Sequence, residues 1–144
     1  MKKILLIIIM VTCMYITCGN SIVISEENIV ANDRIDTVID SIVSQEHVDI
    51  VKAIIHVESG GDSLAVSSTG DYGIMQINKR TWQKVYDFNR IMELEYNITA
   101  GYEILKRCLV ASNGNMRHAL KKYNGKWSYS DKVMKVRDEQ RTSY

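Results

Sequence analysis

The chain has 144 residues, which is enough for one domain with one hydrophobic core. Hydrophobic residues make up 46% of it and charged residues 24%, an ordinary balance for a globular protein, and the formal net charge is +1. This near-neutral charge gives no sign of a nucleic-acid-binding surface. The absence of proline and the scarcity of strand-type alternation favour helices.

Residues 1–19 are expected to form a secretory signal peptide. Lys2 and Lys3 precede an apolar run at residues 4–11, and a basic start followed by a short apolar stretch is typical of such peptides. The run is shorter than the roughly 20 apolar residues that span a membrane, which favours a cleaved signal over a retained anchor. We therefore expect an exported protein that meets the membrane only through this segment.

The cysteines and histidines indicate neither a disulfide framework nor a metal site. Cys13 and Cys18 lie within the signal segment, which leaves Cys108 alone in the exported chain. A threonine precedes each early cysteine where lipidation sites usually have glycine or alanine, so lipidation is not expected. We expect no metal and no cofactor, because no metal-ligand spacing is found among His47, His56 and His118.

The remaining chain is predicted to be helical from residue 32 onward, after a flexible lead-in at residues 20–31. Asn32 or Asp33 begins a first helix whose apolar residues, from Ile35 to Val43, recur at helical spacing. A second helix is predicted from about residue 46 to Glu58. Ser59-Gly60-Gly61 ends it, because glycine is favoured just beyond a helix C-terminus. A long irregular segment rich in glycine and serine follows at residues 59–75.

Asparagine residues mark the predicted starts of the next three helices. Asn78 caps a short helix over about residues 79–87, Asn97 begins a longer one, and Asn115 caps a helix that Gly125 ends. A last amphipathic helix contains Val133, and residues 137–144 are expected to be a solvated tail. The fold class predicted for residues 32–136 is therefore all-α, with about six helices and one long loop.

Glu58 is the first candidate for chemistry. It follows Ile54 by four residues and Val51 by seven, so it continues the apolar stripe of its helix and faces the irregular segment. A carboxyl group among apolar side chains ionises less readily, so its pKa should rise towards neutrality. Such a group can hold a proton at the working pH and act as a general acid.

Four sequence blocks resemble a known family, the lysozyme-like SLT catalytic domain of lytic transglycosylases. The blocks occur in the family's order and spacing over roughly residues 46–136, and they read Ile54-Ile-His-Val-Glu58-Ser59-Gly60, Ala65-Val-Ser67-Ser-Thr-Gly70-Asp-Tyr-Gly73-Ile-Met-Gln76, Asn97-Ile-Thr-Ala-Gly101-Tyr and Ala119-Leu-Lys-Lys-Tyr123-Asn124-Gly125. The resemblance implies a lysozyme-like (SLT/goose-type) fold. It also implies action on the glycan strands of bacterial peptidoglycan, in the periplasm or cell envelope.

The resemblance assigns roles to the matching positions. Glu58 corresponds to the family's catalytic acid/base, and Ser67 to a serine that orients the N-acetyl group of the substrate. The strip that lines the sugar groove is represented by Tyr72, Gly73, Met75 and Gln76. For Tyr72, lining the groove and packing against the fold both remain open.

The last block supplies the other implied contacts. Tyr123 corresponds to a tyrosine whose hydroxyl lies close to the glutamate, and Asn124 supports its surroundings. Lys122 stands where the family usually has alanine, which weakens this block. Trp127 and Tyr129 follow it and are candidates for one wall of the groove, whereas Trp82 is expected to pack inward.

The residue at position 78 bears on the type of reaction. Goose-type lysozymes carry an aspartate two residues after the glutamine of this strip, but this chain has Asn78, and an amide cannot activate water. A single acid suffices if the 2-acetamido group of the substrate attacks C1, and the 6-hydroxyl then closes an anhydro ring. Asp71 is the nearby carboxylate that could alter this interpretation, although a solvated turn is its expected role.

The leading hypothesis is therefore a peptidoglycan lytic transglycosylase that leaves 1,6-anhydroMurNAc ends at the MurNAc–GlcNAc β-1,4 bond. One alternative is a goose-type lysozyme-like hydrolase of the same bond. The other is a non-catalytic glycan-binding assembly component. The chain resembles small, specialised members of the family, so components of a secretion, pilus or conjugation apparatus are possible partners.

Overall fold

The computed structural model describes residues 26–142, so the expected signal peptide with Cys13 and Cys18 lies outside the described residues. The domain is mainly helical, which confirms the predicted all-α class. In chain order its elements are α2 (Glu26–Ile42), the 3-10 turn η1 (Gln45–His47), α3 (Val48–Glu58), β1 (Asp71–Tyr72), β2 (Ile77–Asn78), α4 (Lys79–Trp82), α5 (Leu94–Val110), α6 (Met116–Asn124) and α7 (Trp127–Thr142). No described helix has the length and apolar character needed to cross a membrane.

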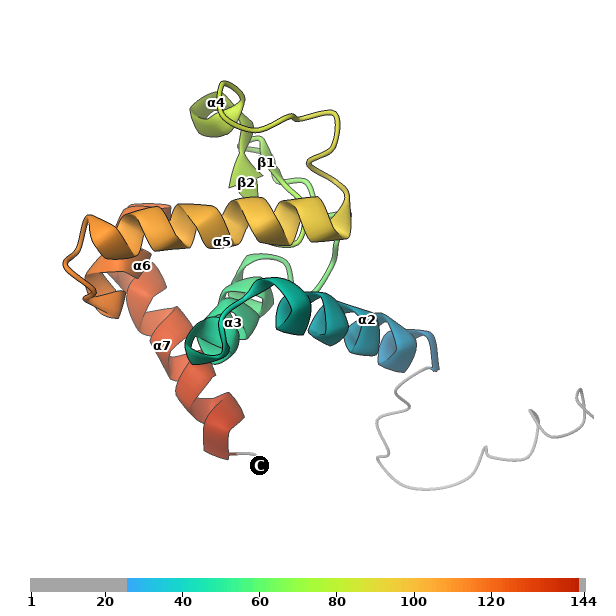
Figure 1. Ribbon diagram of the computed structural model, residues 1–144, viewed down its shortest axis with the longest axis horizontal. Helices are drawn as coiled ribbons and strands as arrows, with labels where there is room; N and C mark the ends of the chain where they lie inside the picture. Colours follow the sequence, from blue (N-terminus) through green and yellow to red (C-terminus); the bar gives the residue numbers. More distant parts are fainter. Residues whose placement is uncertain (1–25, 143–144) are drawn as a thin grey trace, which may run out of the picture.

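Helix α5 crosses the middle of the molecule and separates its two sides (Figure 1). The β1–β2 hairpin and α4 lie on one side of it, and α2, α3 and α7 lie on the other. Helix α3 packs against α7, and α6 packs against both α5 and α7. This packing brings the end of α3 close to the start of α7, although the two segments are far apart in the sequence.

The apolar stripes predicted from the sequence meet in one core. Val51 and Ile54 of α3 are fully buried, as their position on the stripe of Glu58 requires. The chain after α3 contributes further buried side chains to the same cluster, among them Ile74, Met75, Ile98, Leu105, Leu120 and Val133. The core therefore lies directly beneath the helix end that carries Glu58.

Two predicted helix starts are confirmed by their caps. The Asn78 side chain accepts a hydrogen bond from the Thr81 backbone N–H at 3.1 Å, and the Asn115 side chain accepts one from the His118 N–H at 3.0 Å. Both bonds satisfy backbone donors that a helix N-terminus otherwise leaves unpaired. Gly125 ends α6 in the left-handed conformation, with φ of 91°.

Several predicted boundaries differ from the structure. Helix α2 begins at Glu26, within the predicted flexible lead-in, because neither proline nor glycine interrupts the chain between that residue and Asn32. Helix α7 continues to Thr142, where the predicted tail is helical and Arg141 forms an ion pair with Asp49 at 2.5 Å. Helix α4 ends at Trp82, and the irregular segment contains one half of a two-stranded hairpin.

Asn97 was expected to begin a helix, but it lies inside α5, where it is 1% exposed. Its side-chain oxygen accepts the Met75 N–H at 2.8 Å, and its amide donates to the carbonyl oxygens of Tyr72 at 2.9 Å and Ile91 at 2.8 Å. Gly73 leaves room for this amide, because a Cβ there would overlap Asn97. Asn97 thus fastens the loop before β2 to α5.

We expect the Asn97→Ala variant to lose about 3 kcal/mol of unfolding free energy. The substitution leaves three backbone groups without partners in a buried site, and each such group is expensive to desolvate. Urea denaturation followed by circular dichroism measures the loss. Asn89→Ala, at an exposed turn, serves as the control and should change stability by less than about 0.5 kcal/mol. Equal losses in the two variants would contradict this role.

Candidate active site

A cleft of about 500 Å³ opens beside the C-terminal end of α3. One wall comes from the β1–β2 hairpin and α4, the floor from α5, and the other wall from the end of α6 and the turn that follows it. The residues that line it are Glu58, Thr69, Asp71, Gln76, Ile77, Asn78, Arg80, Thr81, Trp82, Ile104, Cys108, Lys122, Tyr123, Asn124, Gly125 and Lys126. Hydroxyl, amide, carboxyl and cationic groups predominate, which suits a polar ligand such as a sugar chain.

Glu58 ends α3 at the inner edge of this cleft. Burial raises the pKa of its carboxyl from 4.5 to about 7. A hydrogen-bonding contribution from Tyr129 lowers the pKa, and the negative charge of Asp71 raises it. Lys132 and Asn124 lower it further. The group is therefore shared between its acid and its carboxylate form near neutral pH, as a residue that first donates and then accepts a proton requires.

Tyr129 is the residue near Glu58 that sequence analysis did not identify as part of the acid's surroundings. Its side chain is 8% exposed, and among the described residues its hydroxyl meets no partner at full hydrogen-bond geometry. The hydroxyl is nevertheless close enough to Glu58 to lower the pKa of that carboxyl. It thus lies next to the acid in the buried layer behind the cleft. The spacing in the sequence indicates that Tyr129 faces inward, because it precedes the fully buried Val133 by four residues on the same helix face.

Tyr123 lines the cleft together with Glu58, and it also bonds the loop before β2. Its hydroxyl donates to the Met75 carbonyl oxygen at 3.2 Å, and its ring stacks on Tyr129 with 6.3 Å between the ring centroids. Burial raises the pKa of Tyr123 well above its ordinary value, so it stays protonated. Tyr123 therefore ties α6 to the loop before β2 and positions Tyr129.

Replacing Tyr129 by Phe should shift the basic limb of the pH–rate profile to higher pH. The hydroxyl stabilises the Glu58 carboxylate, so its removal leaves Glu58 protonated over a wider range. The rate of fragment release from peptidoglycan, the substrate that the sequence resemblance implies, checks this when it is measured between pH 5 and pH 9. Tyr123→Phe retains the Tyr129 hydroxyl and should leave that limb in place. A basic limb that moves equally in both variants would contradict the assignment.

Asp71 lies in the cleft instead of forming the solvated turn expected for it. Its carboxylate accepts hydrogen bonds from Ser67 at 2.6 Å, Thr69 at 2.5 Å and Asn78 at 2.7 Å. Burial raises the pKa of Asp71, but these three hydrogen bonds outweigh it and hold the pKa below its ordinary value. Asp71 is therefore an ionised carboxylate near a protonatable one.

The hairpin register explains how Asp71, for which a solvated turn was expected, comes to lie in the cleft. Asp71 and Asn78 are partners across β1 and β2, so a carboxylate lies on the strand opposite the position where aspartate was sought. Asn78 caps α4 with its side-chain oxygen and binds Asp71 with its amide. The view that the site contains one acid and no second carboxylate is thus corrected.

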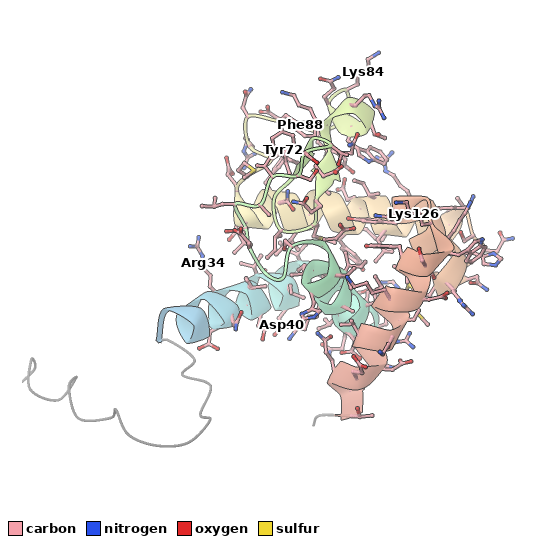
Figure 2. All side chains as sticks on the ribbon, turned by 180° about the vertical axis from the view of Figure 1, so that it is seen from behind. Arg34, Asp40, Tyr72, Lys84, Phe88 and Lys126 are labelled. Atoms are coloured by element: carbon pink, nitrogen blue, oxygen red, sulfur yellow. The ribbon has the colours of Figure 1, made fainter. Side chains whose placement is uncertain are left out.

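Four residues assigned to substrate binding do not line the cleft. Met75 is fully buried in the core, and Gly73 is buried beneath the loop, where its carbonyl accepts the Gln76 amide. Tyr72 packs edge-on against Phe88, at 5.8 Å between ring centroids, and this contact favours packing as its role. Both residues are labelled in Figure 2. The Ser67 hydroxyl donates to Asp71 and is used within the loop.

Gln76 and Asn124 do line the cleft. The Gln76 amide donates to the carbonyl oxygens of Ala65 at 3.1 Å and Gly73 at 2.8 Å, which fixes a residue whose φ is 49°. Asn124 lies on the wall of the cleft, close enough to Glu58 to lower the pKa of its carboxyl. Trp82, which was expected to pack inward, also reaches the cleft from the end of α4. An amide and an aromatic face are therefore available to a bound sugar.

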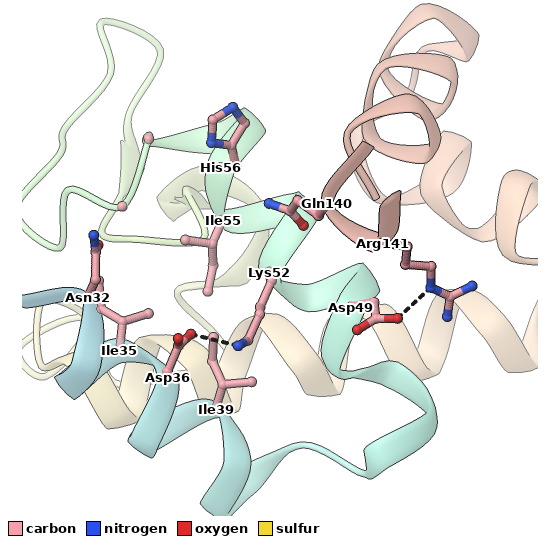
Figure 3. A pocket seen from close by; sticks show the side chains of 12 residues that line it. Asn32, Ile35, Asp36, Ile39, Asp49, Lys52, Ile55, His56, Gln140 and Arg141 are labelled. Carbon is pink, nitrogen blue, oxygen red and sulfur yellow. Dashed lines mark hydrogen bonds and ion pairs between the residues drawn. The ribbon is translucent and has the colours of Figure 1, made fainter. Parts of the chain in front are cut away.

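A second groove, of about 410 Å³, is lined by residues of α2, α3 and the end of α7 (Figure 3). Its charged side chains form ion pairs, Lys52 with Asp36 at 2.8 Å and Arg141 with Asp49. The nearby His56 is exposed. The chemical features of a general acid are thus concentrated in the Glu58 cleft.

A family model described as the Transglycosylase SLT domain matches residues 43–143, well over half of the sequence. The matched range contains every residue that lines the Glu58 cleft. Neither the curated proteins nor the solved structures give a significant match.

Proposed function

The chain belongs to the transglycosylase SLT domain family, whose members act on peptidoglycan. From this premise we propose that it cleaves the MurNAc–GlcNAc β-1,4 bond, with Glu58 acting first as the acid and then as the base. The observation that carries the proposal is the carboxyl group of Glu58, whose pKa of about 7 leaves a proton available in a sugar-sized polar cleft. The proposed product has a 1,6-anhydroMurNAc end.

The proposed reaction has two proton transfers through one residue. Protonated Glu58 gives its proton to the glycosidic oxygen while the 2-acetamido oxygen of the muramic acid bonds to C1 and displaces it. The resulting Glu58 carboxylate then removes the proton of the 6-hydroxyl. That oxygen bonds to C1, the bond from the acetamido oxygen breaks, and no water is consumed.

Asp71 supports this route electrostatically. Positive charge develops at C1 as the leaving oxygen departs, and a fixed, ionised carboxylate in the cleft stabilises that charge. The same negative charge keeps the pKa of Glu58 high enough for proton donation. Ser67, Thr69 and Asn78 hold Asp71 ionised and in place, so in this proposal they act through Asp71.

A second candidate function is hydrolysis of the same bond, and the position of Asp71 is what favours it. Glycosidases usually use two carboxylates, one as acid and the other as nucleophile or as base for water. Glu58 and Asp71 line the same cleft and differ in protonation state, as such a pair requires. The product then carries a reducing end instead of an anhydro ring.

A digestion of purified sacculi tests the proposed activity against a non-catalytic role. We expect the purified protein to release soluble muropeptide fragments over time. A protein that binds sacculi and releases nothing would be an assembly or binding component. The proposed cellular setting, local opening of the wall for a secretion, pilus or conjugation apparatus, rests on the resemblance alone. In that setting a Glu58→Gln gene should fail to restore apparatus assembly in a deletion strain.

A further inference from the structure

Three cationic side chains at the mouth of the Glu58 cleft have no role in the proposed reaction. Arg80 lies on the α4 wall, and Lys122 and Lys126 lie on the opposite wall, at the end of α6 and just beyond it. All three are exposed. Within residues 26–142, none of them forms an ion pair. We call Arg80, Lys122 and Lys126 the cationic rim.

The acids of the cleft do not neutralise this rim. Glu58 is largely protonated below neutral pH, and the Asp71 carboxylate is bound by three hydrogen-bond donors of its own loop. The floor between the walls is formed by uncharged residues of α5, Ile104 and Cys108. Positive charge is thus concentrated where a bound chain would leave the cleft, although the protein as a whole is nearly neutral.

We propose that the cationic rim binds the carboxylates of the peptides that branch from the muramic acid units, so that the cleft prefers peptide-bearing glycan strands to denuded ones. The inference rests on the proposed function, because it takes peptidoglycan as the substrate. A glycan backbone of N-acetylated sugars is uncharged apart from the lactyl group, whereas the stem peptides carry several carboxylates. Flexible Lys and Arg side chains at an exposed edge suit such branching anions.

The position of the rim favours the peptide over the lactyl group as the source of the carboxylate. A lactyl carboxylate is attached close to the sugar ring and would lie within the cleft with the sugar. A stem peptide extends out of the cleft and passes the exposed side chains on both walls. Lys122 also departs from the alanine that the family's signature usually has at this position, so we assign this preference to the present chain.

Binding to an inactive protein tests the inference without requiring turnover. In the Glu58→Gln protein, we would measure calorimetrically the Kd for soluble peptide-bearing strands, for the same strands after an amidase has removed the peptides, and for a neutral N-acetylglucosamine oligomer. We expect the peptide-bearing strands to bind at least about fivefold more tightly than the denuded strands at low salt. This advantage should disappear in about 0.5 M salt, which screens exposed charges.

Matched triple variants identify the residues responsible. Arg80→Gln/Lys122→Gln/Lys126→Gln should remove the advantage of peptide-bearing strands and leave the binding of denuded strands unchanged. Arg34→Gln/Lys79→Gln/Lys84→Gln removes the same charge from exposed positions outside the cleft and should retain the advantage. Figure 2 shows Arg34 on α2 and Lys84 beyond α4, both directed away from the molecule.

Three results would overturn the inference. The first is an unchanged preference in the rim variant, and the second is an equal loss in the Arg34/Lys79/Lys84 variant. The third is denuded strands that bind as tightly as peptide-bearing ones and lose as much in the rim variant, which would assign the contact to the lactyl carboxylate. A protein that clears sacculi but gives any of these results keeps its proposed function and loses this preference.

Discussion

Replacing Glu58 by Gln should lower the rate of fragment release from sacculi by about 10³-fold, within the range that a general acid contributes. The amide has nearly the same shape as the carboxylic acid, but it has no proton to give to the leaving oxygen. It also cannot remove one from the 6-hydroxyl. Glu95→Gln, at an exposed position in the first turn of α5, is the matched control and should retain full activity.

The same substitution should stabilise the protein above neutral pH. Glu58 has a folded-state pKa of about 7 against an ordinary value of 4.5, so the unfolded chain loses the proton first as the pH rises. The folded protein is therefore progressively destabilised between about pH 4.5 and 7, and remains so above that window. Allowing for solvent screening, we expect Glu58→Gln to gain about 1–2 kcal/mol at pH 8 and almost nothing at pH 4.

Urea denaturation at the two pH values separates the catalytic from the structural role of Glu58. An inactive variant with a stability gain at pH 8 alone fits a buried acid whose ionisation destabilises the fold. An inactive variant that is less stable at both pH values would mean that Glu58 holds the fold together. A variant that still clears sacculi would remove Glu58 from the reaction altogether.

Replacing Asp71 by Asn should lower the rate of fragment release by about 10- to 100-fold, because the positive charge at C1 then loses a fixed counter-charge. The variant should also shift the basic limb of the pH–rate profile to lower pH. Asp71 raises the pKa of Glu58 through its negative charge, and the neutral amide does not. The measurement is the initial rate of release between pH 5 and pH 9.

Asp62→Asn is the control for a loop carboxylate outside the cleft. The Asp62 side chain accepts the Leu64 N–H at 2.8 Å, is exposed, and does not line the cleft. We expect it to leave both the rate and the pH profile unchanged. If the two variants behaved alike, Asp71 would be a turn residue, as its sequence context first suggested.

The parts of the site that could be predicted from the sequence depend on local patterns. Glu58 follows Val51 and Ile54 at helical spacing, so its place on a buried stripe and its raised pKa follow from residues within two turns of one helix. The caps at Asn78 and Asn115 are equally local, because each residue bonds a backbone group three positions away.

The parts that could not be predicted depend on contacts between distant segments. Asp71 reaches the cleft because β1 pairs with β2 in one register. A strand of two residues is too short to show the alternation of apolar and polar side chains that predicts a strand from the sequence. Asparagine is a common helix cap, but Asn97 lies inside α5. There its side chain forms hydrogen bonds with three backbone groups that lie outside its own helical turn. Tyr129 lies beside Glu58 because α7 packs on α3, which no spacing within either helix specifies.

The mass of the fragments released from sacculi tests the central claim most directly. If Glu58 acts with the acetamido and 6-hydroxyl groups of the substrate, every new muramic acid end should be the 1,6-anhydro form. Mass spectrometry of the digest would then show fragments that lack one water relative to the reducing sugar. Fragments with reducing ends, one water heavier, would contradict transglycosylation and would make Glu58 and Asp71 the two carboxylates of a hydrolase.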